Sequence, residues 1–160
     1  MFALIPPWVP FLLLGLLFLG YRQSVTRVVK PRVLLAVALG MLGFSLYGVA
    51  SAFGASAMVL LLWAAGYLLA AVGGARRVAA SGLARVGGAV RVPGSWWPMV
   101  LILGIFTAKF ALGFAAGVHA PVLQSSAFIA TMSLVLGALS GGFGARAFAV
   151  HRVASGAPAA

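Results

Sequence analysis

The stretch "LILGIFTAKFALGF", Leu101–Phe114, places a single lysine, Lys109, inside an otherwise apolar run. The chain of 160 residues contains no aspartate and no glutamate, 64% of its residues are hydrophobic and 7% are charged. Soluble domains carry about one quarter charged residues, so this composition predicts a membrane protein. We expect the stretch to belong to a transmembrane helix, with Lys109 about 16 Å from the helix start and close to the bilayer midplane.

Lysine and arginine residues divide the rest of the chain into uncharged blocks whose lengths can be compared with the bilayer. The first block, ending at Tyr21, fits one span, whereas residues 33–75 and 92–145 each have about twice the length of a span. Turn-forming residues interrupt these two blocks at "SAFGAS" (51–56) and "VHAP" (118–121). We therefore predict one domain over residues 1–150, an all-α membrane protein folded as a five-span transmembrane helical bundle. The spans are expected at residues 3–21, 33–52, 56–75, 97–118 and 123–147.

The distribution of cations predicts the orientation of the bundle. Every lysine and arginine except Lys109 lies between spans one and two, between spans three and four, or at or beyond the end of span five. Positively charged loops remain preferentially in the cytoplasm, so we expect the N-terminus outside and the C-terminus inside. We expect the basic loops to contact anionic lipid headgroups, at about 1 kcal/mol per cation. Nucleic-acid binding is not expected, because the charge is split between two loops beside a membrane.

The loop between spans three and four has an alternating pattern. In "LARVGGAVRV" (83–92), two four-residue runs flank Gly87 and Gly88, which is typical of a short β-hairpin. An isolated hairpin is marginally stable in water, so it would need support from the membrane or a partner, and an irregular surface loop is the alternative. Ser95 is expected to cap the next helix. Residues 151–160 lack an apolar face and are predicted to form a disordered tail.

Small residues and hydroxyl groups define the predicted surroundings of Lys109. Lys109, Gly113 and Gly117 share one helix face at four-residue intervals, and such stripes of small residues let helices approach closely. We expect these glycines, and the pair on span five, to pack against other helices: Gly113, Gly117, Gly137 and Gly141. Counting depth along spans two and five places four hydroxyl groups within about two turns of Lys109. They are candidates for binding a ligand or partner together with Lys109: Ser45, Tyr47, Thr131 and Ser133.

The composition excludes several kinds of chemistry. There is no cysteine and no carboxylate side chain, which removes disulfides, thiolate sites and paired acid–base catalysis. His119 and His151 are expected at opposite membrane faces, so they cannot share one metal ion or haem. No metal or other cofactor is expected. A Ser–Lys pair of Ser45 or Ser133 with Lys109 is chemically conceivable, but nothing in the local sequence specifies it, so we do not expect an enzyme.

Several segments carry a resemblance to a known family. The chain contains "IPPWV", then "SLYGVASAFG" leading into "LLLWAAG", and then "RVPGSWWPMVLILGIFTAKFALG". Together they resemble a family of small multispan inner-membrane proteins of proteobacteria that is labelled a domain of unknown function. The "VPGSWWP" and "TAKF" segments (92–98 and 107–110) are the most specific parts. The resemblance implies the bacterial inner membrane and supports the span count, and it implies no activity.

The absence of acids leaves three ways to accommodate Lys109. The amine can be neutral, it can meet an anionic ligand or lipid group, or it can pair with an acidic residue of another protein. Copies of the same chain cannot supply that acid. The favoured hypothesis is an accessory or assembly subunit that pairs Lys109 with an acidic integral-membrane partner. The alternative is a small carrier or binder of an anionic or apolar ligand within the bundle.

Overall fold

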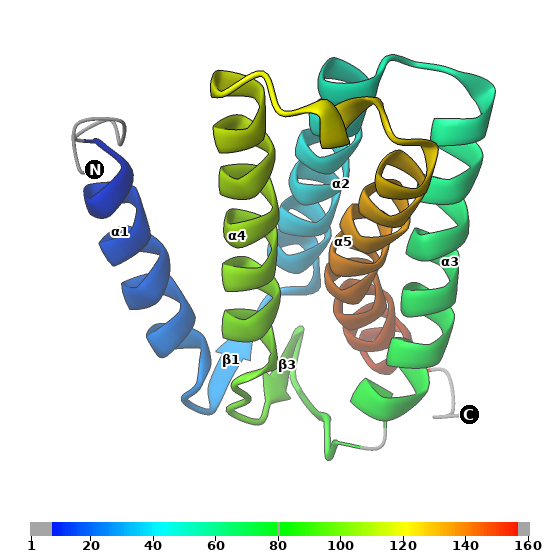
Figure 1. Ribbon diagram of the computed structural model, residues 1–160. Coiled ribbons are helices and arrows are strands. Elements are labelled where there is room, and N and C mark those ends of the chain that lie inside the picture. Colours follow the sequence, from blue (N-terminus) through cyan, green and yellow to red (C-terminus); the bar gives the residue numbers. More distant parts are fainter. Residues whose placement is uncertain (1–7, 80, 157–160) are drawn as a thin grey trace.

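The computed structural model describes residues 8–79 and 81–156, which form a helical bundle with a small sheet at one end (Figure 1). The α-helices are α1 (Trp8–Gln23), α2 (Pro31–Phe53), α3 (Ala57–Ala79), α4 (Trp97–Gly117) and α5 (Ser126–Ala154). A short 3-10 helix, η2 (Pro121–Gln124), joins α4 to α5. The strands are β1 (Arg27–Val29), β2 (Ala84–Val86) and β3 (Ala89–Val92). Successive α-helices run in alternating directions, so the start of α1 and the end of α5 lie at opposite ends of the bundle (Figure 1).

Four of the described helices are long and apolar enough to cross a membrane: Pro31–Phe53, Ala57–Val78, Trp97–Gly117 and Ser126–Ala154. They correspond to the predicted spans two to five, and the chain is therefore compatible with a membrane protein. Residues 3–7 of the first predicted span lie outside the described residues. In α1, the apolar segment Leu13–Arg22 is shorter than these four helices, and a fifth crossing remains a prediction.

The closest helix contact is between α3 and α5, and glycines make it possible. A Cβ at Gly137 would collide with the backbone carbonyl of Trp63, and one at Gly141 would collide with the carbonyl of Tyr67. From the other side, a Cβ at Gly66 would collide with the carbonyl of Leu134. The two backbones are thus in direct contact, as small-residue stripes permit in membrane helices.

A buried apolar cluster joins four helices in the half of the bundle away from the sheet. Its buried members are Val49 of α2, Val59 and Trp63 of α3, Ala108 and Leu112 of α4, and Leu136 of α5. The buried positions of α4 recur at helical spacing, at Leu101, Ile105, Ala108 and Leu112, so one face of α4 is fixed against the core. In contrast, α1 packs on the outside of α4, where Gly20 lies against Met99.

The predicted β-hairpin is confirmed, and it belongs to a larger sheet. Strands β2 and β3 pair antiparallel, with Val86 opposite Ala89, and Gly87 adopts a φ of 58° at the turn. A positive φ at the first turn position is what a primed hairpin turn requires. The sequence reasoning missed β1, which pairs antiparallel with the other edge of β3 to give the order β1-β3-β2.

The end of α5 supports this sheet. Val150 of α5 is fully buried against Val90 and Val92 of β3. With 29 residues, α5 spans about 43 Å, which exceeds a bilayer core of about 30 Å, so its last turns extend beyond the apolar segment. The hairpin therefore packs on a helix and a third strand of the same chain.

Helix α5 continues further than the predicted start of the tail allows. Disorder was predicted from residue 151, whereas α5 continues to Ala154 because Val153 and Ala154 pack against the sheet cluster. Residues 157–160 of the predicted tail lie outside the described residues. At the start of α4, the N-cap position is Trp96, which makes no side-chain cap hydrogen bond, so the predicted cap at Ser95 is wrong by one residue. Ser95 Oγ still accepts a hydrogen bond from the Trp97 N–H over 3.2 Å.

Candidate functional site

Lys109 lies in the seam between α2 and α4, beside the packed face of α4. Ala108 points into the core, and the next residue, Lys109, is turned about 100° around the helix and is partly buried. Its Nζ lies 4.5 Å from the centroid of the Phe44 ring on α2. A Cβ at Gly48 would collide with Nζ, so the ammonium group occupies the space that this glycine leaves open. The aromatic ring and the notch at Gly48 together form the immediate site of the amine.

The Lys109 ammonium has an aromatic neighbour and no hydrogen bond to the described part of the chain. A cation over an aromatic face is attracted by the ring, at about 2 kcal/mol when water is removed. Phe44 is 53% exposed, so one side of the ring and of the seam is open to the surroundings. The site can therefore hold a cation and still admit an external anion.

The hydroxyl groups predicted near Lys109 bind elsewhere. Ser45 is 1% exposed, accepts a hydrogen bond from Trp63 Nε1 over 3.0 Å and donates to the Leu136 carbonyl over 3.1 Å. Thr131 and Ser133 donate to carbonyls one turn earlier on α5, at Ala127 and Ile129. Tyr47 is 73% exposed on the outside of α2. Their role in binding a ligand or partner remains a prediction, and Phe44 and Gly48 are the neighbours that sequence reasoning missed.

The glycines of α4 differ from those of α5. Gly137 and Gly141 lie at the α3–α5 contact described above. Gly113 and Gly117 are exposed, and a Cβ at either would meet no described atom within 4 Å. The packing partner predicted for Gly113 and Gly117 is thus not provided by the described residues of this chain. The face of α4 that continues from Lys109 is open.

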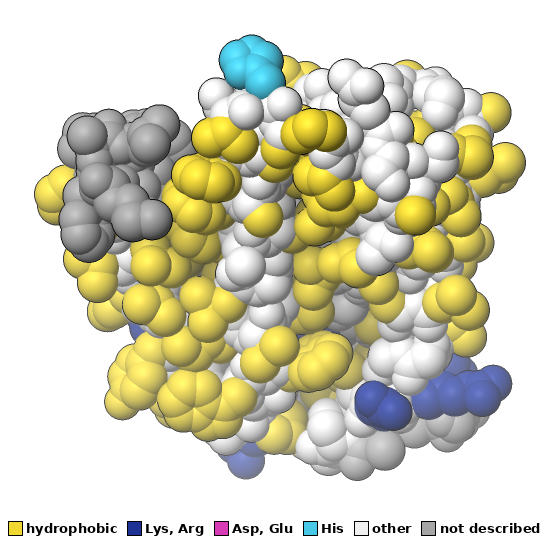
Figure 2. All heavy atoms as spheres, in the orientation of Figure 1, with side chains coloured by type: hydrophobic (Ala, Val, Ile, Leu, Met, Phe, Trp, Pro, Cys, Tyr) yellow, Lys and Arg dark blue, Asp and Glu magenta, His cyan; other side chains and the backbone are white. Residues whose placement is uncertain are grey.

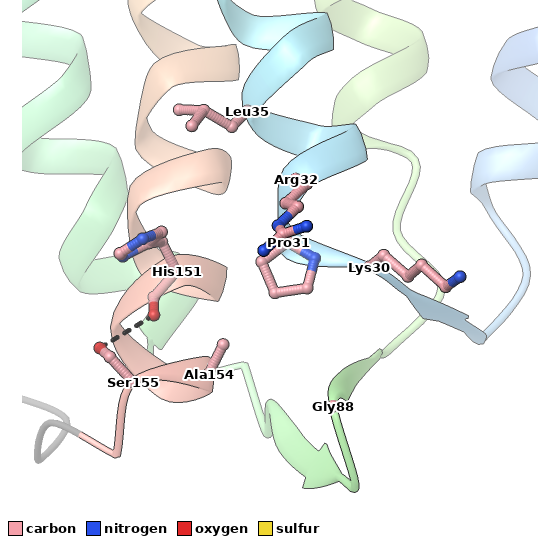
Figure 3. Close-up of a pocket in the computed structure, with 8 residues that line it drawn as sticks. All are labelled: Lys30, Pro31, Arg32, Leu35, Gly88, His151, Ala154 and Ser155. Carbon is pink, nitrogen blue, oxygen red and sulfur yellow. Dashed lines mark hydrogen bonds between the residues drawn. The ribbon is translucent and has the colours of Figure 1, made fainter.

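The other cations lie at the end of the bundle that carries the sheet. Figure 2 shows lysine and arginine side chains gathered there on the visible face, with apolar side chains covering the rest of the helices. A pocket of about 640 Å³ at this end is lined by Arg32 of α2, by His151 and Ala154 of α5, and by Ser155, which follows α5 (Figure 3). The His151 carbonyl accepts a hydrogen bond from Ser155 Oγ over 3.1 Å, while the Lys30 side chain extends away from the other labelled residues (Figure 3).

The two histidines are far apart. His119 follows the end of α4 with a φ of 50°, at the end of the bundle opposite to His151 (Figure 1). Within residues 8–79 and 81–156, no three potential metal-ligating side chains of histidine, cysteine, aspartate or glutamate gather in one place. Lys109 therefore remains the candidate site.

Comparison with known families gives a match over the whole chain. A family described as a family of unknown function (DUF6622) matches residues 1–160. The chain belongs to DUF6622. No curated protein and no solved structure matches the chain. Membership of DUF6622 agrees with the resemblance to a domain of unknown function, and it assigns no activity to Lys109 or to any other residue.

Proposed function

We propose that this protein is a non-catalytic accessory or assembly subunit of the bacterial inner membrane, in which Lys109 pairs with an acidic residue of a partner membrane protein. The position of the Lys109 Nζ carries the proposal, since it lies in an open helix seam with an aromatic ring as its neighbour. A charge near the bilayer midplane costs about 2.5–3.5 kcal/mol on insertion scales. One cation–π contact offsets about 2 kcal/mol of this cost, and an external carboxylate offsets the rest.

The open face of α4 supports a helix as the source of that carboxylate. Gly113 and Gly117 continue from Lys109 along one stripe, and a Cβ at either would meet no described atom within 4 Å. Membrane helices associate through small residues that allow close approach and through polar side chains that bind across the contact. A partner helix that packs on this stripe brings an aspartate or glutamate within reach of Lys109.

The partner must be a different protein. The sequence contains no acidic side chain, so a second copy of this chain cannot neutralise Lys109. The cation-rich end of the bundle is proposed to face the cytoplasm, because positive charge near the ends of membrane helices favours that side. In this orientation, the Gly113–Gly117 stripe lies in the outer half of the membrane.

Copurification in a mild detergent tests the proposal. We expect mass spectrometry of the wild-type preparation to detect an integral membrane protein with an acidic residue in a transmembrane helix. Both Lys109→Leu and Gly113→Leu are expected to lose this partner. The first removes the charge, and the second places a large side chain on the stripe where the partner helix would pack. Ala111→Leu, on a different face of the same helix and also exposed, is the matched control and retains the partner.

Two results would contradict the proposal. One is a partner that stays bound to Lys109→Leu and Gly113→Leu with wild-type stoichiometry. The other is copurification of a small anionic molecule that is lost in Lys109→Leu while no acidic membrane protein is found, which would replace the assembly role with that of a ligand binder.

A further inference from the structure

A pocket at the cation-rich end of the bundle, between α3 and α5, is separate from the Lys109 seam. Its volume is about 630 Å³. One wall is a stripe of α3 that passes through Leu69, Gly73 and Arg77, and the other is a stripe of α5. The connection from β3 to α4 closes one end of the pocket with residues 92–95 and Trp97.

Arg146, on the α5 wall, is a buried cation with no counterion among residues 8–79 and 81–156. It is 7% exposed, and its Nε has no hydrogen-bond partner. The positive charge of Arg27 also acts on Arg146 and is repulsive. Removing a guanidinium group from water is costly unless an anion and hydrogen-bond acceptors replace the lost hydration. Because the chain has no acidic side chain, no side chain of the protein can supply that anion.

The pocket changes character along its length. Leu69 and Ala138 lie at one end, and Arg77 and Arg146, each two turns further along its helix, lie at the other. Leu69 is 73% exposed on the apolar outside of the bundle. From Leu69 to Arg77 the rise is about 12 Å, from the depth of lipid chains toward the depth of headgroups. The pocket thus has an apolar end and a cationic end, which match an amphiphile with an anionic head.

The start of α4 adds further donors at the cationic end. Trp97, the first residue of this 21-residue helix, lines the pocket, and a helix N-terminus carries a partial positive charge. Ser95 Oγ accepts from the Trp97 N–H and keeps its own proton for a ligand. A planar guanidinium group, such as that of Arg77 or Arg146, can bind two oxygens of one phosphate through two parallel hydrogen bonds.

We propose that this pocket binds the phosphate group of an anionic phospholipid or a similar amphiphile, with Arg77 and Arg146 on the phosphate and the apolar chain along Leu69 and Ala138. Gly73 has no side chain and leaves room for the apolar chain of the ligand, since a Cβ there would meet no described atom within 4 Å. Arg146 holds the inner oxygens of the phosphate, and Arg77, which is exposed, holds it from the entrance.

Thermal unfolding of the purified full-length protein in detergent tests the site. The probes are phosphatidylglycerol, phosphatidylcholine as the zwitterionic lipid, and inorganic phosphate. We expect phosphatidylglycerol to raise the unfolding temperature at concentrations where the other two have no effect. Arg77→Gln is expected to weaken the apparent affinity about tenfold or more, because hydrogen bonds to charged groups are strong. Gly73→Leu is expected to abolish the shift by filling the pocket without removing charge.

The matched control is Arg32→Gln, which removes one cation from the other pocket at the same end (Figure 3). It should keep the wild-type response to phosphatidylglycerol. Arg146→Gln should lose the response, and Arg77→Gln and Gly73→Leu decide the matter if that variant does not fold. The proposal is overturned if Arg77→Gln and Gly73→Leu respond like the wild type. An equal shift with inorganic phosphate would overturn the amphiphile as the ligand.

Discussion

Ser45 is the residue through which side-chain hydrogen bonds join three helices. Its hydroxyl on α2 accepts from the Trp63 indole N–H of α3 and donates to the Leu136 carbonyl of α5. The Leu136 carbonyl also accepts from Ser140 Oγ over 3.0 Å. An indole N–H that is buried without an acceptor keeps its full desolvation penalty, so the value of Ser45 lies mainly in satisfying Trp63.

Substitution of Ser45 should therefore cost more than the small change in volume suggests. Ser45→Ala leaves the Trp63 N–H unpaired, and we expect a loss of about 1–3 kcal/mol in the free energy of unfolding. In the Trp63→Phe background, the same substitution should cost much less, because no donor remains to be satisfied. Unfolding of the four proteins of this double-mutant cycle in detergent gives the coupling energy. Equal costs of Ser45→Ala in both backgrounds would show that the hydrogen bond contributes nothing.

The same residues show the limits of sequence reasoning at this scale. Depth along a helix can be counted at a fixed rise per residue, and this placed Ser45 at about the level of Lys109. The direction of a side chain around the helix axis depends on which neighbours the helix has, and a sequence of apolar helices leaves this open. Phe44 and Gly48 contact Lys109, whereas Ser45, next to Phe44 in the chain, points toward α3 and α5.

At the scale of helices, the glycines of α5 and α4 have opposite surroundings. A Cβ at Gly137 would collide with the α3 backbone, whereas a Cβ at Gly113 would meet no described atom within 4 Å. The sequence presents both as members of four-residue stripes of small residues. The stripe predicts that a close contact is allowed, and the rest of the fold decides whether the chain itself provides the partner.

This difference predicts opposite outcomes for the same substitution. Gly137→Ala should push α3 and α5 apart and lower the free energy of unfolding by about 1–3 kcal/mol, as overpacking does in dense cores. Gly113→Ala should leave the stability of the isolated protein unchanged or slightly raised, because alanine favours helix over glycine. Thermal unfolding of both variants in one detergent measures the contrast. A stable Gly137→Ala protein would contradict the close α3–α5 contact.

The sheet shows why local patterns predict only part of an element. The alternation on either side of Gly87 and Gly88 is a local signal, and it correctly predicted the pairing of β2 with β3. Strand β1 is only three residues long, and it pairs with β3 across more than 60 residues of sequence, Arg27 with Val92. Such a short segment has no periodicity to detect, and its pairing depends on α1, α2 and α5 bringing it to the sheet.

At the scale of the whole molecule, charge and length agree on one architecture. The described part of the chain carries every lysine and arginine except Lys109 at the end with the sheet or in the helix turns next to it (Figures 1 and 2). The sequence predicted this asymmetry because uncharged blocks of span length are visible without any tertiary information. It could not predict that the overhang of α5 would cover the sheet, because that contact depends on three-dimensional packing.

The complete topology can be tested with single cysteines, since the native chain has none. We expect Ala55→Cys, in the turn between α2 and α3, to react with a membrane-impermeant maleimide on intact spheroplasts. Gly88→Cys, at the exposed hairpin tip where a Cβ meets no described atom within 4 Å, should react only after the membrane is opened, because the positive end is proposed to face the cytoplasm. Ala3→Cys should react like Ala55→Cys if α1 crosses the membrane. If Ala3→Cys is protected while Ala55→Cys reacts, α1 does not cross the membrane and the protein has four spans. If Gly88→Cys reacts on intact spheroplasts and Ala55→Cys does not, the orientation is the opposite of the proposed one.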